Sequence, residues 1–213
     1  MKILITAGPT REPIDPVRFI SNRSSGKMGY AVASVARERA HDVVLISGPV
    51  SLEAPEGVEV VKVLTADDMC RAVEERIGWC DALVMVAAVA DWRPEQVQAQ
   101  KMKKSPAAMI LRLEPTPDIL KAVRPKKGRR LFVGFAAETQ NVLEEARRKL
   151  RDKGLDLIVV NDVSRPGSGF EADRNQVTLL PRDGAPEPLP LLPKRDVAAR
   201  IVEWVERHAP APA

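Results

Sequence analysis

The side chains best suited to chemistry lie directly after short apolar runs of the sequence. Residues 8–29 follow the first run and end in Ser24-Ser25-Gly26-Lys27, at the start of a predicted helix. Backbone N–H groups at a helix N-terminus, two hydroxyls and an ammonium would together bind an anion such as phosphate. Two plainer interpretations stay open: Ser-Ser-Gly is also a good helix cap, and the whole loop could be a solvated surface excursion.

Two familiar nucleotide-binding motifs are excluded in this loop. The phosphate-binding lysine loop requires Ser or Thr after Gly-Lys, and Gly26-Lys27 is followed by Met28. The dinucleotide fingerprint requires three glycines at fixed spacing, and only Gly26 and Gly29 are present. The loop is also longer than the roughly two to six residues that join a strand to a helix in such folds. A phosphate site here would therefore be of another kind.

Charged side chains also follow the apolar run at residues 82–88. Asp91 comes soon after this run, at an expected sheet edge where a carboxylate can bind a divalent cation, and residues 101–104 hold three lysines. Turn capping by Asp91 and ordinary solvation of the lysines are the alternatives. Pro115 and Pro117 then form a rigid segment, with Pro117 expected at the first position of the next helix.

Apolar runs alternate with amphipathic segments along most of the chain. This pattern predicts a Rossmann-like α/β fold, a mostly parallel sheet with helices on both faces, in one domain over residues 1–213. Strands are predicted at residues 2–6, 42–47, 58–63, 82–88, 109–113, 130–135, 155–160 and, at a sheet edge, 176–180. Helices are predicted at 26–39, 66–77 (capped by Thr65), 117–123, 142–153 and 194–207, and the proline-rich residues 181–193 are expected to form an extended surface connector. Four consecutive strands are followed by polar or glycine-containing loops, so a ligand site is expected at that rim.

Composition narrows the class of protein. The chain has 213 residues, of which 45% are hydrophobic and 29% charged, as in folded proteins rather than disordered ones. A net charge of +4 and 4% aromatic residues argue against nucleic acid as a partner, and no apolar run approaches the roughly 20 residues that span a membrane. The start of the chain is typical of a buried strand rather than a signal peptide, and Cys70 and Cys80 lack metal-ligand spacing, so a cytoplasmic protein is expected. His41 and His208 lie far from the polar loops, which disfavours histidine catalysis.

Several long motifs occur in one order and together resemble a known enzyme family. They are GPTREPIDPVRFISNRSSGKMG, AAVADWRP, KMKK, PTPDIL, GFAAET and VVNDVSRPGSGF. Over roughly residues 2–180 the chain resembles phosphopantothenoylcysteine synthetase. In many bacteria that enzyme is the carboxyl-terminal half of a bifunctional flavoprotein of coenzyme A biosynthesis.

The resemblance implies a ligase that joins 4′-phosphopantothenate to L-cysteine. The carboxylate attacks the α-phosphate of CTP, which gives an acyl-cytidylate and pyrophosphate, and the cysteine amine then displaces CMP. Mg²⁺ is the implied cofactor, no flavin is expected in this chain, and the bacterial-style motifs favour CTP over the ATP of eukaryotic relatives. The family is dimeric, so residues 8–29 are expected to reach the second subunit of a homodimer, and a fused or separate decarboxylase would build a higher-order assembly.

The resemblance also assigns roles to individual residues. Asn22 and Lys101 are the implied catalytic residues: Asn22 would bind phosphopantothenate or the acyl-cytidylate, and Lys101 would hold phosphate oxygens. Asp91 is the implied metal ligand. The implied substrate-binding residues are Asn22, Ser24, Ser25, Gly26 and Lys27. The implied nucleotide contacts are Met85, Val86, Ala87, Asp91, Lys101, Pro117, Asp118, Ile119, Leu120, Phe135, Lys149 and Lys153.

Two other classes of function compete with this interpretation. A short-chain NAD(P) reductase shares the expected sheet but requires Tyr-x-x-x-Lys, and the only tyrosine, Tyr30, is followed four residues later by Ser34. A non-catalytic nucleotide-binding subunit would bind CTP without releasing pyrophosphate. Lys149 and Lys153 lie one helical turn apart, a spacing that suits a two-point phosphate clamp and equally an ordinary exposed helix face.

Overall fold

The centre of the structure is an eight-stranded, mostly parallel sheet. The computed structural model describes residues 1–104, 108–138, 142–162 and 172–209. The strands run in the order β13-β12-β10-β9-β6-β1-β4-β5, and only the two pairings of β12 are antiparallel. Their bounds are β1 Lys2–Ala7, β4 Asp42–Ser47, β5 Glu59–Lys62, β6 Ala82–Met85, β9 Leu131–Glu138, β10 Leu157–Asp162, β12 Val177–Pro181 and β13 Glu187–Pro188. The predicted Rossmann-like α/β fold is confirmed.

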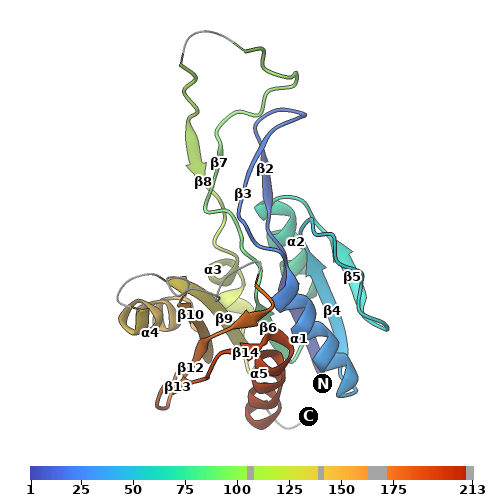
Figure 1. The fold of residues 1–213 in the computed structure, drawn as a ribbon, viewed down its shortest axis with the longest axis vertical. Helices are drawn as coiled ribbons and strands as arrows, with labels where there is room; N and C mark the ends of the chain where they lie inside the picture. The colour runs from blue at the N-terminus through green and yellow to red at the C-terminus, as the bar shows by residue number, and fades with distance from the viewer. Residues whose placement is uncertain (105–107, 139–141, 163–171, 210–213) are drawn as a thin grey trace.

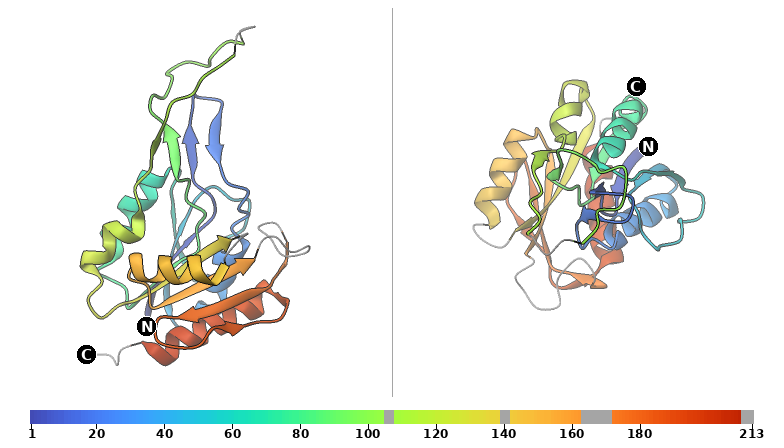
Figure 2. Two further views of the ribbon diagram at one scale, coloured as in Figure 1. Left: turned by 90° about the vertical axis from the view of Figure 1, so that its left-hand side faces the viewer. Right: turned by 90° about the horizontal axis from the view of Figure 1, so that it is seen from above.

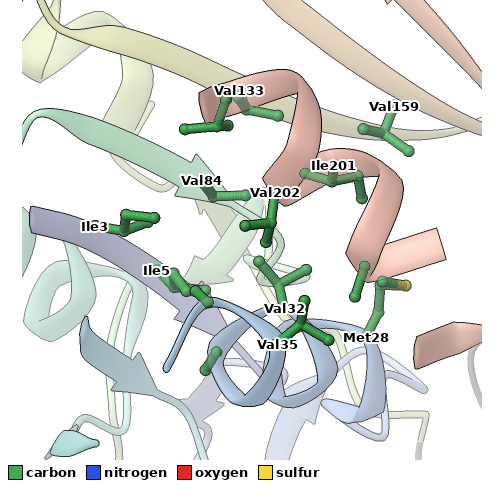
Figure 3. Packing of buried hydrophobic residues seen from close by; sticks show 14 of the residues in the cluster. Ile3, Ile5, Met28, Val32, Val35, Val84, Val133, Val159, Ile201 and Val202 are labelled. Atoms are coloured by element: carbon green, nitrogen blue, oxygen red, sulfur yellow. The ribbon is translucent and has the colours of Figure 1, made fainter. Parts of the chain in front are cut away.

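Helices cover both faces of this sheet (Figure 1). One face carries α1 (Lys27–Glu38) and α5 (Lys194–His208); the other carries α2 (Ala66–Arg76), α3 (Ile119–Val123) with the 3-10 helix η1 (Arg124–Lys126) after it, and α4 (Val142–Asp152). Val32 of α1 and Val202 of α5 pack in one cluster with Ile3 of β1 (Figure 3). Because strands are covered on both sides, their sequences read as continuous apolar runs. None of the described helices is long and apolar enough to cross a membrane.

Two short ribbons extend from the carboxyl edge of the sheet and form an arm (Figures 1 and 2). The arm comprises residues 11–21, with β2 (Arg11–Pro13) and β3 (Phe19–Ser21), and residues 92–104 and 108–115, with β7 (Trp92–Pro94) and β8 (Leu113–Pro115). Asp15 fastens the two ribbons together, since its Oδ2 accepts a hydrogen bond from the Met102 N–H at 3.1 Å. Arg18 adds a second link, from Nη2 to the Met102 carbonyl at 3.0 Å.

Two predicted segments differ from the structure. The strand predicted at residues 109–113 is absent: β8 starts at Leu113 and pairs with β7 in the arm, and Ile110 is exposed, so the alternating pattern there has no core behind it. Residues 181–193 lie mostly at the surface, as expected of a connector, but they also contain β13 and the buried Leu189. β13 also covers β12, which is therefore not the edge strand that the sequence predicted.

Element ends differ from prediction for local reasons. β6 ends at Met85, earlier than predicted, because the backbone beyond it turns to donate a hydrogen bond to Thr6 Oγ1. The helix predicted from Pro117 starts two residues later, since the Asp118 carboxylate is its N-cap and accepts from the Lys121 N–H at 3.2 Å. β9 and β10 continue beyond their predicted ends toward the carboxyl edge.

The predicted cap of α2 is confirmed. Thr65 Oγ1 accepts from the Asp68 N–H at 3.1 Å, and the Asp68 carboxylate accepts from the Thr65 N–H at 3.0 Å, which together form a capping box. The buried carboxylate of Glu12 accepts from the Ala66 N–H at 2.9 Å. The base of the arm is therefore docked on the same helix end.

Candidate functional site

Two cavities lie at the carboxyl edge of the sheet, where β1, β6, β9 and β10 end. Ligands of open α/β sheets bind at this edge. The first, the α3 cavity, has a volume of about 260 Å³ and is lined by Met85, Ala87, Val89, Asp91, Thr116, Pro117, Asp118, Ile119, Leu120, Phe135, Ala136, Ala137, Lys149 and Lys153. The second, the α1 cavity, has a volume of about 140 Å³ and is lined by Gly8, Ser24, Gly26, Lys27, Met28, Gly29, Val86, Ala87, Ala88, Phe135, Ala136, Ala137, Asn161, Asn175 and Lys194.

The α3 cavity carries both signs of charge. Lys149 and Lys153 come from the end of α4, where the Lys153 N–H donates to the Lys149 carbonyl at 3.0 Å and so keeps the two side chains one turn apart. Lys153 Nζ lies 3.6 Å from Asp118 Oδ2, and Asp91 lines the same cavity. Two ammonium groups suit a polyphosphate, and two carboxylates suit a divalent cation that arrives with it.

The N-terminus of α1 lies at the second cavity. Gly26 is its N-cap, with a φ of 78° in the left-handed region that favours glycine. Gly29 lets the helix approach β1 closely, since a Cβ there would lie 2.5 Å from the Ala7 Cβ. With Ser24 and Lys27 beside the helix end, this arrangement suits an anion.

Two lysines place positive charge in the α1 cavity. Lys27 Nζ lies 2.6 Å from Asp173 Oδ1, and this contact holds the pKa of the Asp173 carboxyl below its usual range. Lys194 is buried, and its ammonium donates to the Ala172 carbonyl. Burial lowers the pKa of Lys194, and the charge of Lys27 lowers it further, while Asp173 opposes the shift. An anion in this cavity would offset the repulsion between the two ammonium groups.

The two cavities share a wall. Ala87, Phe135, Ala136 and Ala137 line both of them. Ligands bound in the two cavities would therefore meet along this wall. A reaction between two bound substrates requires such proximity, because holding the reacting groups together removes much of the entropic cost of bringing them into contact.

Most residues assigned from the sequence come together here. Of the twelve residues that the resemblance implies as nucleotide contacts, ten line the α3 cavity: Met85, Ala87, Asp91, Pro117, Asp118, Ile119, Leu120, Phe135, Lys149 and Lys153. The α1 cavity is lined instead by Val86 and by three of the residues implied to bind substrate, Ser24, Gly26 and Lys27. Asn22 lies at its edge, because Nδ2 donates to the Ala88 carbonyl at 2.9 Å, whereas Ser25 lines neither cavity.

Lys101 lies apart from both cavities. It lines a separate hollow of the arm, together with Arg18, residues 102–104, Ala108 and Met109. Arg18 belongs to the turn between β2 and β3, and its bond to the Met102 carbonyl keeps the neighbouring Lys101 on the arm. The structure therefore does not bring Lys101 to the residues of its own chain that the resemblance implies as nucleotide contacts.

Comparison with known proteins decides the family. Residues 1–208 match the family described as "DNA/pantothenate metabolism flavoprotein C-terminal domain". The chain belongs to this family. It is 50% identical over 204 residues to the coenzyme A biosynthesis bifunctional protein CoaBC of Bacillus subtilis, which covers 95% of this chain and 50% of that protein. It is 48% identical over 188 residues to CoaBC of Escherichia coli K12, covering 86% and 46%.

Three solved structures share the fold. The C-terminal domain of a CoaBC protein superposes with a TM-score of 0.83 at 45% identity, covering 97% of this chain and 94% of that one. A DNA/pantothenate metabolism flavoprotein from Streptococcus pneumoniae gives 0.85 at 22% identity, covering 97% and 99%. A Cab2 mutant in complex with phosphopantothenate-cysteine gives 0.76 at 18% identity, covering 97% and 88%. The chain spans about half the length of the curated relatives it matches.

Three polar residues of the α1 cavity were not assigned to the site from the sequence. They are Asn161 in β10, Asn175 in β11 (Arg174–Asn175) and Lys194 at the start of α5. β11 pairs with β14 (Leu192–Pro193), which sets Asn175 near the first turn of α5. Asn161 directly follows an apolar run, a signal that could have found it. The other two residues reach the cavity only through the β11–β14 pairing, which no local pattern indicates.

Proposed function

We propose that this chain is a cytoplasmic, CTP-dependent ligase that joins 4′-phosphopantothenate to L-cysteine in coenzyme A biosynthesis. The wall shared by the two cavities is the observation that carries the proposal. CTP would occupy the α3 cavity and 4′-phosphopantothenate the α1 cavity. The identity to Bacillus subtilis CoaBC and the phosphopantothenate-cysteine bound by Cab2 support this choice of substrates.

The α3 cavity offers groups for each part of CTP. Lys149 and Lys153 would hold phosphate oxygens at two points of one helix end. Backbone groups of residues 85–87 would read the edge of the cytosine, with Phe135 in contact with the nucleotide. Residues 117–120 would lie against the nucleotide where α3 begins.

The α1 cavity offers a matching site for 4′-phosphopantothenate. Its phosphate would lie at the N-terminus of α1, with Lys27 and Ser24 beside it. The carboxylate of 4′-phosphopantothenate would then reach the shared wall, where the α-phosphate of bound CTP would also lie. Asn22 uses one N–H on the Ala88 carbonyl, which leaves its other N–H and its oxygen for the substrate.

The chemistry depends on placement rather than on a protein nucleophile. The substrate carboxylate attacks the α-phosphorus, the bond to the β-phosphate breaks, and pyrophosphate leaves with the electron pair. The cysteine amine then attacks the acyl carbon, the bond to CMP breaks, and the amine proton passes to solvent. Lysines that neutralise phosphate charge favour both steps. The histidines lie elsewhere: His41 Nε2 contacts Glu206 Oε1 at 2.9 Å, and His208 stacks on Trp204.

The acidic residues fit a Mg²⁺ that arrives with the nucleotide. In the part of the chain that the structure describes, no three His, Cys, Asp or Glu side chains converge on a metal site. Mg²⁺ is usually held by one or two carboxylates and the phosphates of its substrate, and Asp91 and Asp118 line the α3 cavity. These two would hold the ion, which would neutralise triphosphate charge.

We also propose that two copies of the chain dimerise through the arm. Ten large hydrophobic side chains are exposed among the described residues, and seven of them belong to the arm: Val17, Phe19, Trp92, Val97, Met109, Ile110 and Leu113. Exposed apolar side chains gathered in this way mark a protein–protein interface. A homodimer would cover them and would bring Lys101 to the second copy, which would explain its place outside the cavities of its own chain.

Release of pyrophosphate tests the proposed reaction. The protein with Mg²⁺, CTP and 4′-phosphopantothenate should release pyrophosphate in a single burst without cysteine, and L-cysteine should then permit turnover. The same assay with ATP measures nucleotide preference, and a lower rate is expected. Binding of CTP without release of pyrophosphate would instead support a non-catalytic nucleotide-binding subunit.

A further inference from the structure

Asn175 holds a buried acceptor that no residue in the described part of the chain satisfies. The residue is 4% exposed and lines the α1 cavity. Its Oδ1 accepts no hydrogen bond from any residue that the structure describes. Most buried polar atoms are paired, because an unpaired one loses its bonds to water and gains nothing in return. An unpaired acceptor in a cavity wall therefore points to a ligand.

The neighbours of Asn175 fix the direction of its amide. Nδ2 lies 3.7 Å from Met28 Sδ, in the first turn of α1, so the donor end faces the protein. The β11–β14 ladder pairs Asn175 with Leu192, two residues before Lys194. The acceptor end is thus left beside the end of α1 and the two lysines that suit an anion.

An acceptor at this position selects for a donor close to the anion. A phosphate oxygen at Oδ1 would be repelled, so the phosphate itself belongs at the N-terminus of α1 and at the lysines. In 4′-phosphopantothenate the donor nearest to the phosphate is the secondary hydroxyl of the pantoyl unit. Its carbon is separated from the phosphate ester oxygen by a methylene and a dimethyl carbon. The apolar wall that Met28, Val86 and Phe135 supply suits those methyl groups.

We infer that Asn175 is a specificity residue of the α1 cavity, whose Oδ1 accepts a hydrogen bond from the pantoyl hydroxyl of 4′-phosphopantothenate. The inference rests on the proposed function and adds a residue to its substrate site. It also implies that the unliganded protein bears an unpaired buried acceptor that the bound substrate pairs.

Asn175→Leu in the full chain tests the inference, because leucine has nearly the same volume and no acceptor. The KM for 4′-phosphopantothenate should rise roughly tenfold or more, the loss typical of a buried hydrogen bond whose partner stays unpaired. The KM for CTP should stay within about twofold, since the α3 cavity does not include this residue. The melting temperature without ligand should hold or rise, whereas a merely structural asparagine would lower it. Asn175→Ala repeats the comparison with a side chain too small to crowd Met28.

A substrate analogue isolates the hydroxyl. Wild type should bind the 2′-deoxy analogue of 4′-phosphopantothenate, which lacks the pantoyl hydroxyl, roughly tenfold more weakly than the substrate, and Asn175→Leu should bind the two about equally. The inference would be overturned if Asn175→Leu lost the same affinity for the analogue as for the substrate, or if neither variant changed the KM for 4′-phosphopantothenate. The proposed function would stand in either case, provided that the wild-type chain turned over. A wild-type chain that released no pyrophosphate with CTP and 4′-phosphopantothenate would overturn the proposed function, and this inference with it.

Discussion

Lys153 Nζ lies 3.6 Å from Asp118 Oδ2, so a cation after α4 and the cap of α3 meet in the wall of the α3 cavity. Both side chains are about one-third exposed, and exposed pairs of this kind contribute roughly 0–1 kcal/mol to stability. The position of this ion pair in the cavity wall therefore matters more than its small contribution to stability. A triphosphate in the cavity would compete with Asp118 for Lys153.

Lys153→Met should raise the KM for CTP by about tenfold or more, because a desolvated contact to phosphate is typically worth over 1 kcal/mol. The melting temperature and the KM for 4′-phosphopantothenate should change little. Lys121→Met is the matched control: Lys121 Nζ lies 3.8 Å from the same oxygen but does not line the cavity. Equal losses of CTP affinity in Lys153→Met and Lys121→Met would contradict the proposed position of the triphosphate.

Asn22 has an amide that is already positioned, since Nδ2 donates to the Ala88 carbonyl at 2.9 Å. Asn22→Ala should slow acyl-cytidylate formation, because the lost hydrogen bond raises the activation free energy by roughly 1–3 kcal/mol. Asn22→Asp should be worse, because it faces that carbonyl and the anionic substrates with a carboxylate. Quench-flow detection of the acyl-cytidylate, beside CTP titration, measures both steps. If Asn22→Ala lost CTP binding but kept its affinity for 4′-phosphopantothenate, the assignment of this loop to 4′-phosphopantothenate would be wrong.

Lys101 should act on the second subunit of the proposed dimer. Lys101→Gln is expected to lower turnover strongly and to change stability by no more than about 0.5 kcal/mol, because the side chain is exposed on the arm. At CTP concentrations well below the KM of Lys153→Met, an equal mixture of Lys101→Gln and Lys153→Met chains should recover about a quarter of wild-type activity above the residual activity of the two variants. Half of the dimers are then hybrids, and each hybrid has one site with both lysines. If Lys101 serves its own chain, mixing restores nothing.

The sequence indicates the sheet and the α3 cavity well, for a physical reason. Parallel strands buried on both faces require apolar runs, and the residues after those runs must gather at the carboxyl edge. Asp91, Asp118 and Phe135 could be placed by that reasoning. Asn175 could not, because its contact with Met28 joins residues 147 positions apart through the two-residue strands β11 and β14. The arm was missed in the same way: the pattern at residues 109–113 is that of a core strand, and only pairing with β7 reveals its true place.

The capping box of α2 gives a prediction about stability alone. Thr65→Ala removes the acceptor of the Asp68 N–H and should cost about 1 kcal/mol of unfolding free energy. Urea unfolding of the variant and wild type measures the difference. Because Thr65 lines neither cavity, the KM values for CTP and 4′-phosphopantothenate should stay the same. A change in either KM would show that the helix end communicates with the site.

Asp15 should control the order of the arm in a pH-dependent way. Its side-chain bond with Arg18 holds the pKa of the Asp15 carboxyl well below its usual range, aided by the N–H groups of Val17, Met102 and Arg18 and opposed by desolvation. A depressed pKa stabilises the folded arm above the unfolded value of about 4, and this stabilisation is lost as the pH falls below it toward the folded pKa.

Hydrogen exchange of residues 98–104 at several pH values measures this control. Wild type should keep its protection of the segment between pH 7 and about 5 and lose it only in stronger acid, because Asp15 stays ionised. Asp15→Asn should exchange faster than wild type between pH 7 and about 5 and lose this pH dependence of protection, since the Met102 N–H and the Arg18 guanidinium then lack their carboxylate. Asp183→Asn makes the same charge change on the β12–β13 hairpin, at the end of the molecule opposite the arm (Figure 1), and should leave the segment as it is in wild type. Since Lys101 adjoins Met102, Asp15→Asn should also lower turnover more than it weakens CTP binding. Equal rates of hydrogen exchange in Asp15→Asn and wild type would show that Asp15 does not hold the arm together.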